Sequence, residues 1–112
     1  MSEKLLHAIN EIITLTEAES DKMISSFKDY SLSKKEYWLQ EGKRCQYIAF
    51  IKSGSMRIFY HDNEGNEVTC FFAGAGTFIT SYSSFLTNQP AHENIIAIDN
   101  TELFIIEKTV LE

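Results

Sequence analysis

A run of hydroxyl side chains follows a small-residue turn and is the stretch of the chain best suited to hold a ligand. Residues 74–86 read GAGTFITSYSSFL, and their hydroxyls belong to Thr77, Thr80, Ser81, Ser83 and Ser84. Neutral hydroxyls both donate and accept hydrogen bonds, which suits an uncharged or weakly charged ligand. The same groups could instead cap a short helix, for which Thr80 or Ser81 alone would suffice. The sequence leaves both interpretations open.

Two further residues near this run carry charge chemistry. His92 follows Pro90 closely and, when protonated, could contact a phosphate or a carboxylate. The alternative is a partly exposed loop histidine with no ligand. Glu93, the next residue, would repel an anion bound beside it.

Aromatic side chains flank the hydroxyl run and could stack on a base or another flat ring. They are Phe71, Phe72, Phe78, Tyr82 and Phe85. Alternation along strands predicts that most of them belong to the core, since aromatic residues dominate protein interiors. Tyr82 is the exception to test.

Composition excludes several classes of function. The 112 residues carry 10 Lys and Arg against 16 Asp and Glu, and no basic cluster exceeds two consecutive residues. This chain alone therefore lacks the basic face that DNA binding requires. The N-terminus is acidic and amphipathic, and no segment approaches about 18 consecutive apolar residues. We expect a cytoplasmic, soluble protein without a membrane segment.

The sequence predicts no enzyme and no metal site. Cys45 and Cys70 are far apart without CxxC spacing, so we expect both to be small buried hydrophobes. A cupin-like metalloenzyme would need two or three histidines converging with a carboxylate, often as His-x-His. His7, His61 and His92 are distant in sequence, and no serine has the Gly-x-Ser-x-Gly context of a hydrolase.

The elements that position these residues form one predicted domain, residues 1–112. A helical lead-in covers 1–28: Leu5, Leu6, Ile9, Ile12 and Ile13 make one stripe over residues 3–15. Thr16 and Glu19 have capping-box spacing for a second helix.

Residues 29–107 are predicted to form a β-roll. Short strands follow at roughly ten-residue spacing, joined by turns at Gly54 and Gly65 and at Asp99-Asn100. The sequence therefore predicts an antiparallel sandwich or barrel.

The order of these landmarks resembles the cyclic-nucleotide-binding domain of the bacterial Crp/Fnr transcription regulators. The matching stretches are LQEGKRCQYIAFIKSGSMRIFY, NEGNEVTCFFAGAGTFI and AIDNTELFII, after two leading helices. The resemblance covers about residues 15–110. It implies a mainly β, double-stranded β-helix (jelly roll) with N-terminal and short internal helices.

The resemblance also implies a ligand cassette. In that family a short helix N-terminus and an arginine hold the phosphate of the cyclic nucleotide, and here the helix would begin near Thr80. Ser81 stands where the family has the glutamate for the ribose, and Ala91-His92 stands where it has arginine-serine. Without that arginine we expect cyclic AMP to bind weakly or not at all. The candidate cassette residues are Gly76, Thr77, Phe78, Ile79, Thr80, Ser81, Tyr82, Ser83, Ala91, His92 and Glu93.

The function expected from the resemblance is the effector-sensing domain of a Crp/Fnr-like transcription regulator, with a small-molecule effector and no certain cofactor. The dimer helix and the helix-turn-helix are not in this chain, so DNA binding and homodimerisation would belong to a longer protein. Two alternatives remain: a free-standing β-roll that interacts or dimerises without a ligand, and a cupin-like small-molecule binder.

Overall fold

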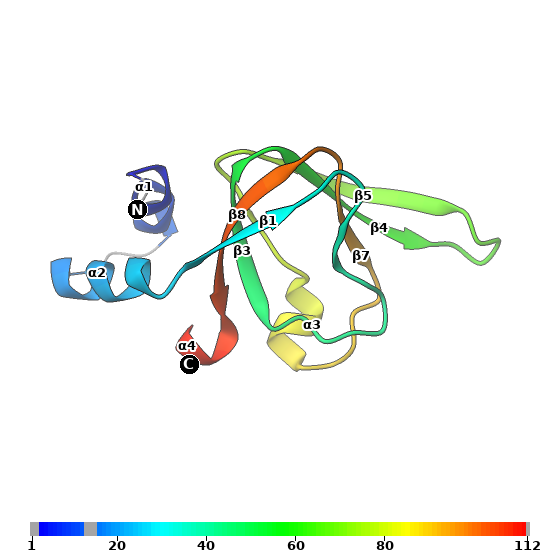
Figure 1. Ribbon diagram of the computed structural model, residues 1–112. Helices are drawn as coiled ribbons and strands as arrows, with labels where there is room; N and C mark the ends of the chain where they lie inside the picture. The colour runs from blue at the N-terminus through cyan, green and yellow to red at the C-terminus, as the bar shows by residue number, and fades with distance from the viewer. Residues whose placement is uncertain (1–2, 13–15, 112) are drawn as a thin grey trace.

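Two helices lead the chain and pack together at one end of the molecule (Figure 1). The computed structural model describes residues 3–12 and 16–111. Helix α1 covers Glu3–Ile12 and α2 covers Glu17–Ser25, so the predicted end of the first helix, residues 13–15, lies outside the described residues. The Thr16 hydroxyl accepts the Glu19 N–H, and the Glu19 carboxylate accepts the Thr16 N–H. This reciprocal pair confirms the predicted capping box.

Among the described residues, eight strands form two antiparallel four-stranded sheets. The first sheet has the order β1-β8-β3-β6, with strands β1 (Lys28–Leu32), β8 (Thr101–Glu107), β3 (Tyr47–Ser53) and β6 (Phe78–Ile79). The second sheet has the order β2-β7-β4-β5, with strands β2 (Tyr37–Leu39), β7 (Asn94–Ala97), β4 (Ser55–His61) and β5 (Glu67–Gly74). The chain changes sheet at every connection except β4–β5, which is the pattern of a β-roll. The mainly β fold is therefore as predicted.

The corners of the roll also follow the prediction. Gly54 lies between β3 and β4 with φ +92°, and Gly65 lies in the β4–β5 turn with φ +84°. Both values fall in the left-handed region, which glycine enters without a Cβ clash. Helix α3 (Tyr82–Thr87) lies between β6 and β7, and the single turn α4 (Lys108–Leu111) follows β8.

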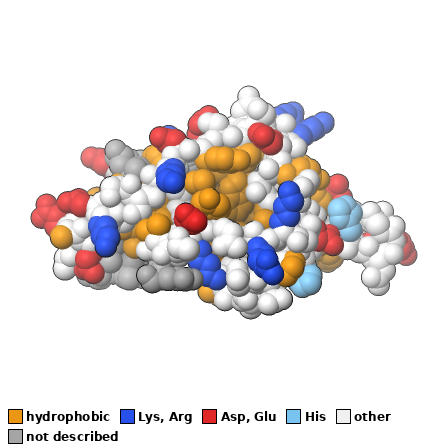
Figure 2. All heavy atoms as spheres, turned by 60° about the horizontal axis from the view of Figure 1, so that its bottom comes forward, with side chains coloured by type: hydrophobic (Ala, Val, Ile, Leu, Met, Phe, Trp, Pro, Cys, Tyr) orange, Lys and Arg blue, Asp and Glu red, His pale blue; other side chains and the backbone are white. Residues whose placement is uncertain are grey.

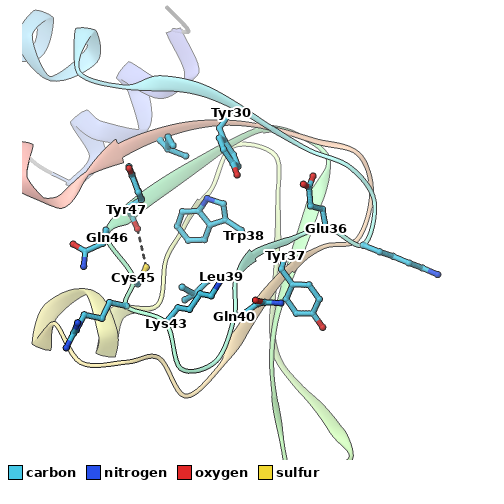
Figure 3. A pocket seen from close by; sticks show the side chains of 13 residues that line it. Tyr30, Glu36, Tyr37, Trp38, Leu39, Gln40, Lys43, Cys45, Gln46 and Tyr47 are labelled. Carbon is cyan, nitrogen blue, oxygen red and sulfur yellow. Dashed lines mark hydrogen bonds between the residues drawn. The ribbon is translucent and has the colours of Figure 1, made fainter.

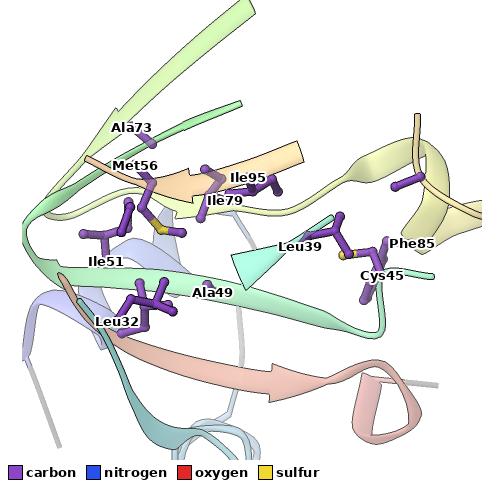
Figure 4. Packing of buried hydrophobic residues seen from close by; sticks show 13 residues of the cluster. Leu32, Leu39, Cys45, Ala49, Ile51, Met56, Ala73, Ile79, Phe85 and Ile95 are labelled. Atoms are coloured by element: carbon purple, nitrogen blue, oxygen red, sulfur yellow. The ribbon is translucent and has the colours of Figure 1, made fainter. Parts of the chain in front are cut away.

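Two hydrophobic clusters hold the layers together. The interior cluster fills the space between the sheets, and Figure 4 shows Leu39, Cys45 and Phe85 together at its α3 end. The second cluster joins Leu5, Ile9 and Phe27 of the leading segment to the other face of the first sheet. The first sheet thus packs against a buried cluster on each face, which anchors the helices to the roll.

The β4–β5 hairpin projects beyond the rest of the roll (Figure 1) and corrects two predictions. Phe71 and Phe72 are 51% and 67% exposed, and Cys70 is exposed, although all three were expected in the core. The register slips between Ile58 and Phe59, so that Cys70 is the extra residue of a β-bulge. Since β5 is also an edge strand, the alternation that usually hides every second residue fails here.

Asp62 organises the tip of this hairpin and gives a pH prediction. Its Oδ1 accepts the backbone N–H groups of Asn66 and Glu64, each at 2.9 Å. The Asn66 bond is the largest cause that lowers the Asp62 pKa below its usual value of 3.8. The ionised form is therefore favoured in the folded hairpin.

We expect the carboxyl carbon of Asp62 to titrate below pH 3.8 in the folded chain and at the ordinary value in urea. A folded-state pKa that is lowered stabilises the hairpin above the unfolded pKa, and this contribution disappears as the pH falls through the folded pKa. Carbon-13 NMR titration measures both midpoints. Equal midpoints in the two states would contradict the hydrogen-bond network.

Candidate functional site

Helix α3 forms the wall of the candidate cassette and begins later than predicted. It starts at Tyr82, two residues after the expected start near Thr80. Thr80 remains outside the helix because its hydroxyl donates to the Tyr47 carbonyl of β3 at 2.8 Å. Ser81 is the N-cap residue, but its side chain makes no capping hydrogen bond. The interpretation of these hydroxyls as helix caps is therefore wrong.

Three of the hydroxyls fasten the cassette to the roll. Besides its bond to Tyr47, the Thr80 oxygen lies 3.1 Å from the Cys45 sulfur. The Ser84 hydroxyl accepts the Cys45 N–H at 2.8 Å and donates to the Gln89 carbonyl at 2.5 Å. Thr77 lies in the turn before β6, where it donates to the Gly74 carbonyl at 2.7 Å. These groups already have protein partners, so they position α3 and the turn.

Ser81 and Glu93 make the distinctive contact of the cassette. The Ser81 hydroxyl, 1% exposed, donates to the Glu93 carboxylate, which comes from the segment before β7 and is half-buried. The two residues are twelve apart in sequence, and the fold brings them together. A carboxylate at this place favours a hydrogen-bond donor or a cation as its partner and disfavours an anion.

The segment that leads to β7 holds Ala91 inside and His92 outside. Ala91 is 2% exposed and belongs to the interior cluster, whereas His92 is exposed. The Ala91 N–H donates to the Lys43 carbonyl at 2.8 Å, and the Ala91 carbonyl accepts the Gly42 N–H at 2.9 Å. Asn94 is buried and accepts the Glu41 N–H at 2.8 Å. Residues 41–43 thus lie along the segment that contains Ala91 and His92.

The remaining predicted cassette residues separate into core and surface. Ile79 is buried in the interior cluster, and Phe78 packs edge-on against Phe50 with ring centroids 5.1 Å apart. Gly76 and Ser83 are exposed, and Tyr82 is 61% exposed at the start of α3. Tyr82 is therefore the surface aromatic that the sequence singled out.

A groove of about 740 Å³ opens elsewhere on the roll, and the sequence did not reveal it. Figure 3 shows the rings of Tyr30, Trp38 and Tyr47 gathered around it, between β1 and the segment that leads into β3. Of the described residues that line the groove, none belongs to the predicted cassette. The only signal was a concentration of large aromatic residues on β1, β2 and the start of β3.

In residues 3–12 and 16–111, no three His, Cys, Asp or Glu side chains lie close enough together to hold a metal ion. Among the helices described there, none is both long and apolar enough to cross a bilayer.

Comparison with known proteins places this geometry in one family. The family model for the cyclic nucleotide-binding domain matches residues 30–112. No curated protein matches the chain.

Three solved structures illustrate the likeness of fold. The Thermus thermophilus catabolite activator protein is 23% identical over 87% of this chain and 45% of its own, with a TM-score of 0.76. The N-terminal domain of a Streptomyces coelicolor A3(2) transcriptional regulator is 16% identical over 99% and 76%, with a TM-score of 0.81. The regulatory subunit of a cAMP-independent protein kinase A from Trypanosoma cruzi, bound to guanosine, is 17% identical over 88% and 34%, with a TM-score of 0.78.

At these identities the structural likeness establishes the fold alone. The chain spans less than half of the Thermus and Trypanosoma chains that it matches.

Proposed function

Because the chain belongs to the cyclic nucleotide-binding domain family, we propose that it is the effector-sensing domain of a Crp/Fnr-type transcription regulator. The similar structures include a catabolite activator protein from Thermus and the N-terminal domain of a transcriptional regulator from Streptomyces, which supports this assignment. DNA binding and homodimerisation would be carried by segments outside these 112 residues.

The contact between Ser81 and Glu93 is the observation that carries the choice of effector. A phosphate in this cassette would meet the Glu93 carboxylate, and the resemblance assigns the buried Ala91 to the position of the family's arginine. Loss of one charge-assisted hydrogen bond costs about 1.5–3 kcal/mol, and a like charge adds repulsion. The effector of this domain is accordingly a neutral or cationic molecule that offers a hydrogen-bond donor to Glu93.

A nucleoside without a phosphate group belongs to this class of effector. The Trypanosoma cruzi regulatory subunit, a protein of related fold, was solved with guanosine bound, and guanosine carries no phosphate. That ligand supports the chemistry proposed for Glu93 without identifying the effector of this chain.

The response to the effector would pass through α3. Ser81 precedes α3 directly, and Ser84 within α3 is bonded to the Cys45 backbone. A ligand that takes over the Glu93 carboxylate releases the Ser81 hydroxyl and changes how α3 is held on the roll. Such a ligand shifts the equilibrium between two arrangements only by its difference in affinity for them.

Guanosine and cyclic GMP provide the matched test, since they share base and ribose and differ by the phosphate. We expect calorimetric titration of the 112-residue chain to show guanosine binding at least about tenfold tighter than cyclic GMP, with cyclic AMP near millimolar or weaker. Glu93→Gln should reduce this preference, whereas Glu64→Gln at the exposed hairpin tip should leave it unchanged.

Micromolar binding of either cyclic nucleotide would overturn the proposal for the effector. If guanosine also fails to bind, a thermal-shift screen of neutral and cationic metabolites identifies the effector class. If neither experiment detects binding, the result would favour the β-roll as an interaction module without a ligand.

A further inference from the structure

The groove described above is the open end of the interior of the roll. Its walls come from two edge strands, β1 of the first sheet and β2 of the second, together with residues 35–36, Gln40, residues 43–47 and Ile105. Tyr30 and Tyr47 each stand two residues before a buried interior residue, Leu32 and Ala49 respectively. Because alternate residues share a face of a strand, both tyrosines lie on the interior face of their sheet.

Aromatic rings line this opening without filling it. Tyr30, Tyr37 and Tyr47 are 42%, 39% and 38% exposed, and Trp38 is half-buried against the interior cluster. Small-molecule pockets commonly enclose about 300–1,000 Å³ and have mainly apolar and aromatic walls. With about 740 Å³ and four partly exposed rings, the groove has the size and lining for a flat organic molecule.

The charge of the groove is opposite to that of the chain. Lys35, Lys43 and Arg44 line it together with a single carboxylate, Glu36, although the whole chain has 10 basic and 16 acidic residues. Within the described residues, no hydrogen bond or ion pair occupies the side-chain nitrogens of Lys35 and Lys43. On the face drawn in Figure 2, hydrophobic side chains gather near the middle, with both basic and acidic side chains around them.

We propose that this groove is a second ligand site, separate from the cassette, for a small planar aromatic carboxylate. The aromatic rings would stack on its ring system, and Lys43 and Arg44 would pair with its carboxylate. The site goes beyond the proposed function, because the cassette prefers a neutral or cationic ligand and lies on other residues.

Residues 41–45 lie between the groove and the cassette. Arg44 and Cys45 line the groove, yet the Arg44 Nε donates to the Asn88 carbonyl at 2.9 Å and the Cys45 N–H donates to Ser84. Asn88 caps the C-terminus of α3. A carboxylate bound by Arg44 therefore acts on a segment that holds the C-terminal half of α3.

Three indoles of matched shape test the proposal. Indole-3-acetate is an anion, tryptophol is neutral and tryptamine is a cation. Trp38 is the only tryptophan of the chain, so its indole N–H gives a single resonance in the nitrogen-15 spectrum. We expect indole-3-acetate to shift this resonance and the Tyr30 and Tyr47 amides, with tryptophol about tenfold weaker and tryptamine weaker still.

Variants separate this site from the cassette. Lys43→Gln should weaken indole-3-acetate binding about tenfold, whereas Lys34→Gln, an exposed lysine that does not line the groove, should leave it unchanged. Glu93→Gln in the cassette should also leave it unchanged, so the two proposals can fail independently. Equal binding of indole-3-acetate and tryptophol, shifts confined to residues 80–93, or no shift at millimolar ligand would each overturn the proposal.

Discussion

Replacing Gly54 with alanine is expected to lower the free energy of unfolding by about 3–5 kcal/mol, the largest stability effect predicted for this chain. Gly54 has φ +92°, where any other residue is strained. A Cβ there would also lie 2.5 Å from the Thr101 Oγ1, 2.6 Å from the Asn100 carbonyl oxygen and 2.8 Å from the Thr101 Cα. Two of these atoms belong to the backbone, so they cannot turn aside as a side chain could.

This close approach matters because it joins two corners of the roll. Thr101, which is fully buried, bonds through its hydroxyl to the Ser55 N–H at 3.3 Å and to the Asp99 carbonyl at 2.8 Å. The β3–β4 corner at Gly54 and the β7–β8 corner before Thr101 are therefore packed against each other. An added methyl group must push them apart.

Gly65→Ala is the matched control, because Gly65 has a similar φ, +84°, and open space where the Cβ would stand. It should cost only about 1–2 kcal/mol, the strain of the left-handed backbone alone. Urea denaturation of both variants measures the difference. Equal losses of stability would show that the two corners are not tightly packed.

The second large expected effect is on the affinity for cyclic AMP, when substitutions adapt the cassette to bind an anion. Ser81→Glu, Ala91→Arg and Glu93→Ala together should raise the affinity for cyclic AMP about 100-fold over the parent chain. The arginine introduced at position 91 supplies a cation for the phosphate, and the glutamate at position 81 restores the residue that the family resemblance assigns to the ribose. Removal of the Glu93 carboxylate takes away the like charge.

Ala91 is 2% exposed, so the arginine must find room beside the interior cluster, at a cost of about 1–3 kcal/mol in stability. Thermal melting establishes whether the triple variant folds. The control replaces Ala91→Arg with Ala91→Gln, which adds bulk without charge and should give little gain in calorimetry. A folded triple variant with no gain would mean that the cassette is aligned wrongly with these positions.

Local sequence signals determined the elements and the class of fold. Thr16 and Glu19 predict a helix start because both partners of the capping box lie three residues apart. Gly54 and Gly65 predict strand reversals because glycine, which has no Cβ, tolerates a positive φ. The assignment of Ser81 and Ala91 to a ligand cassette, which came from the resemblance, stays a prediction.

Only the tertiary structure decided which side chains meet and which face water. Ser81 meets Glu93 across twelve residues, and Phe71 and Phe72 are exposed on the edge strand β5 although their residue types suit a core. The groove is lined by Tyr30, Trp38 and Tyr47, which belong to three strands in two sheets. Strand register and sheet pairing set these distances, and both depend on contacts between residues far apart in the chain, which local periodicity does not encode.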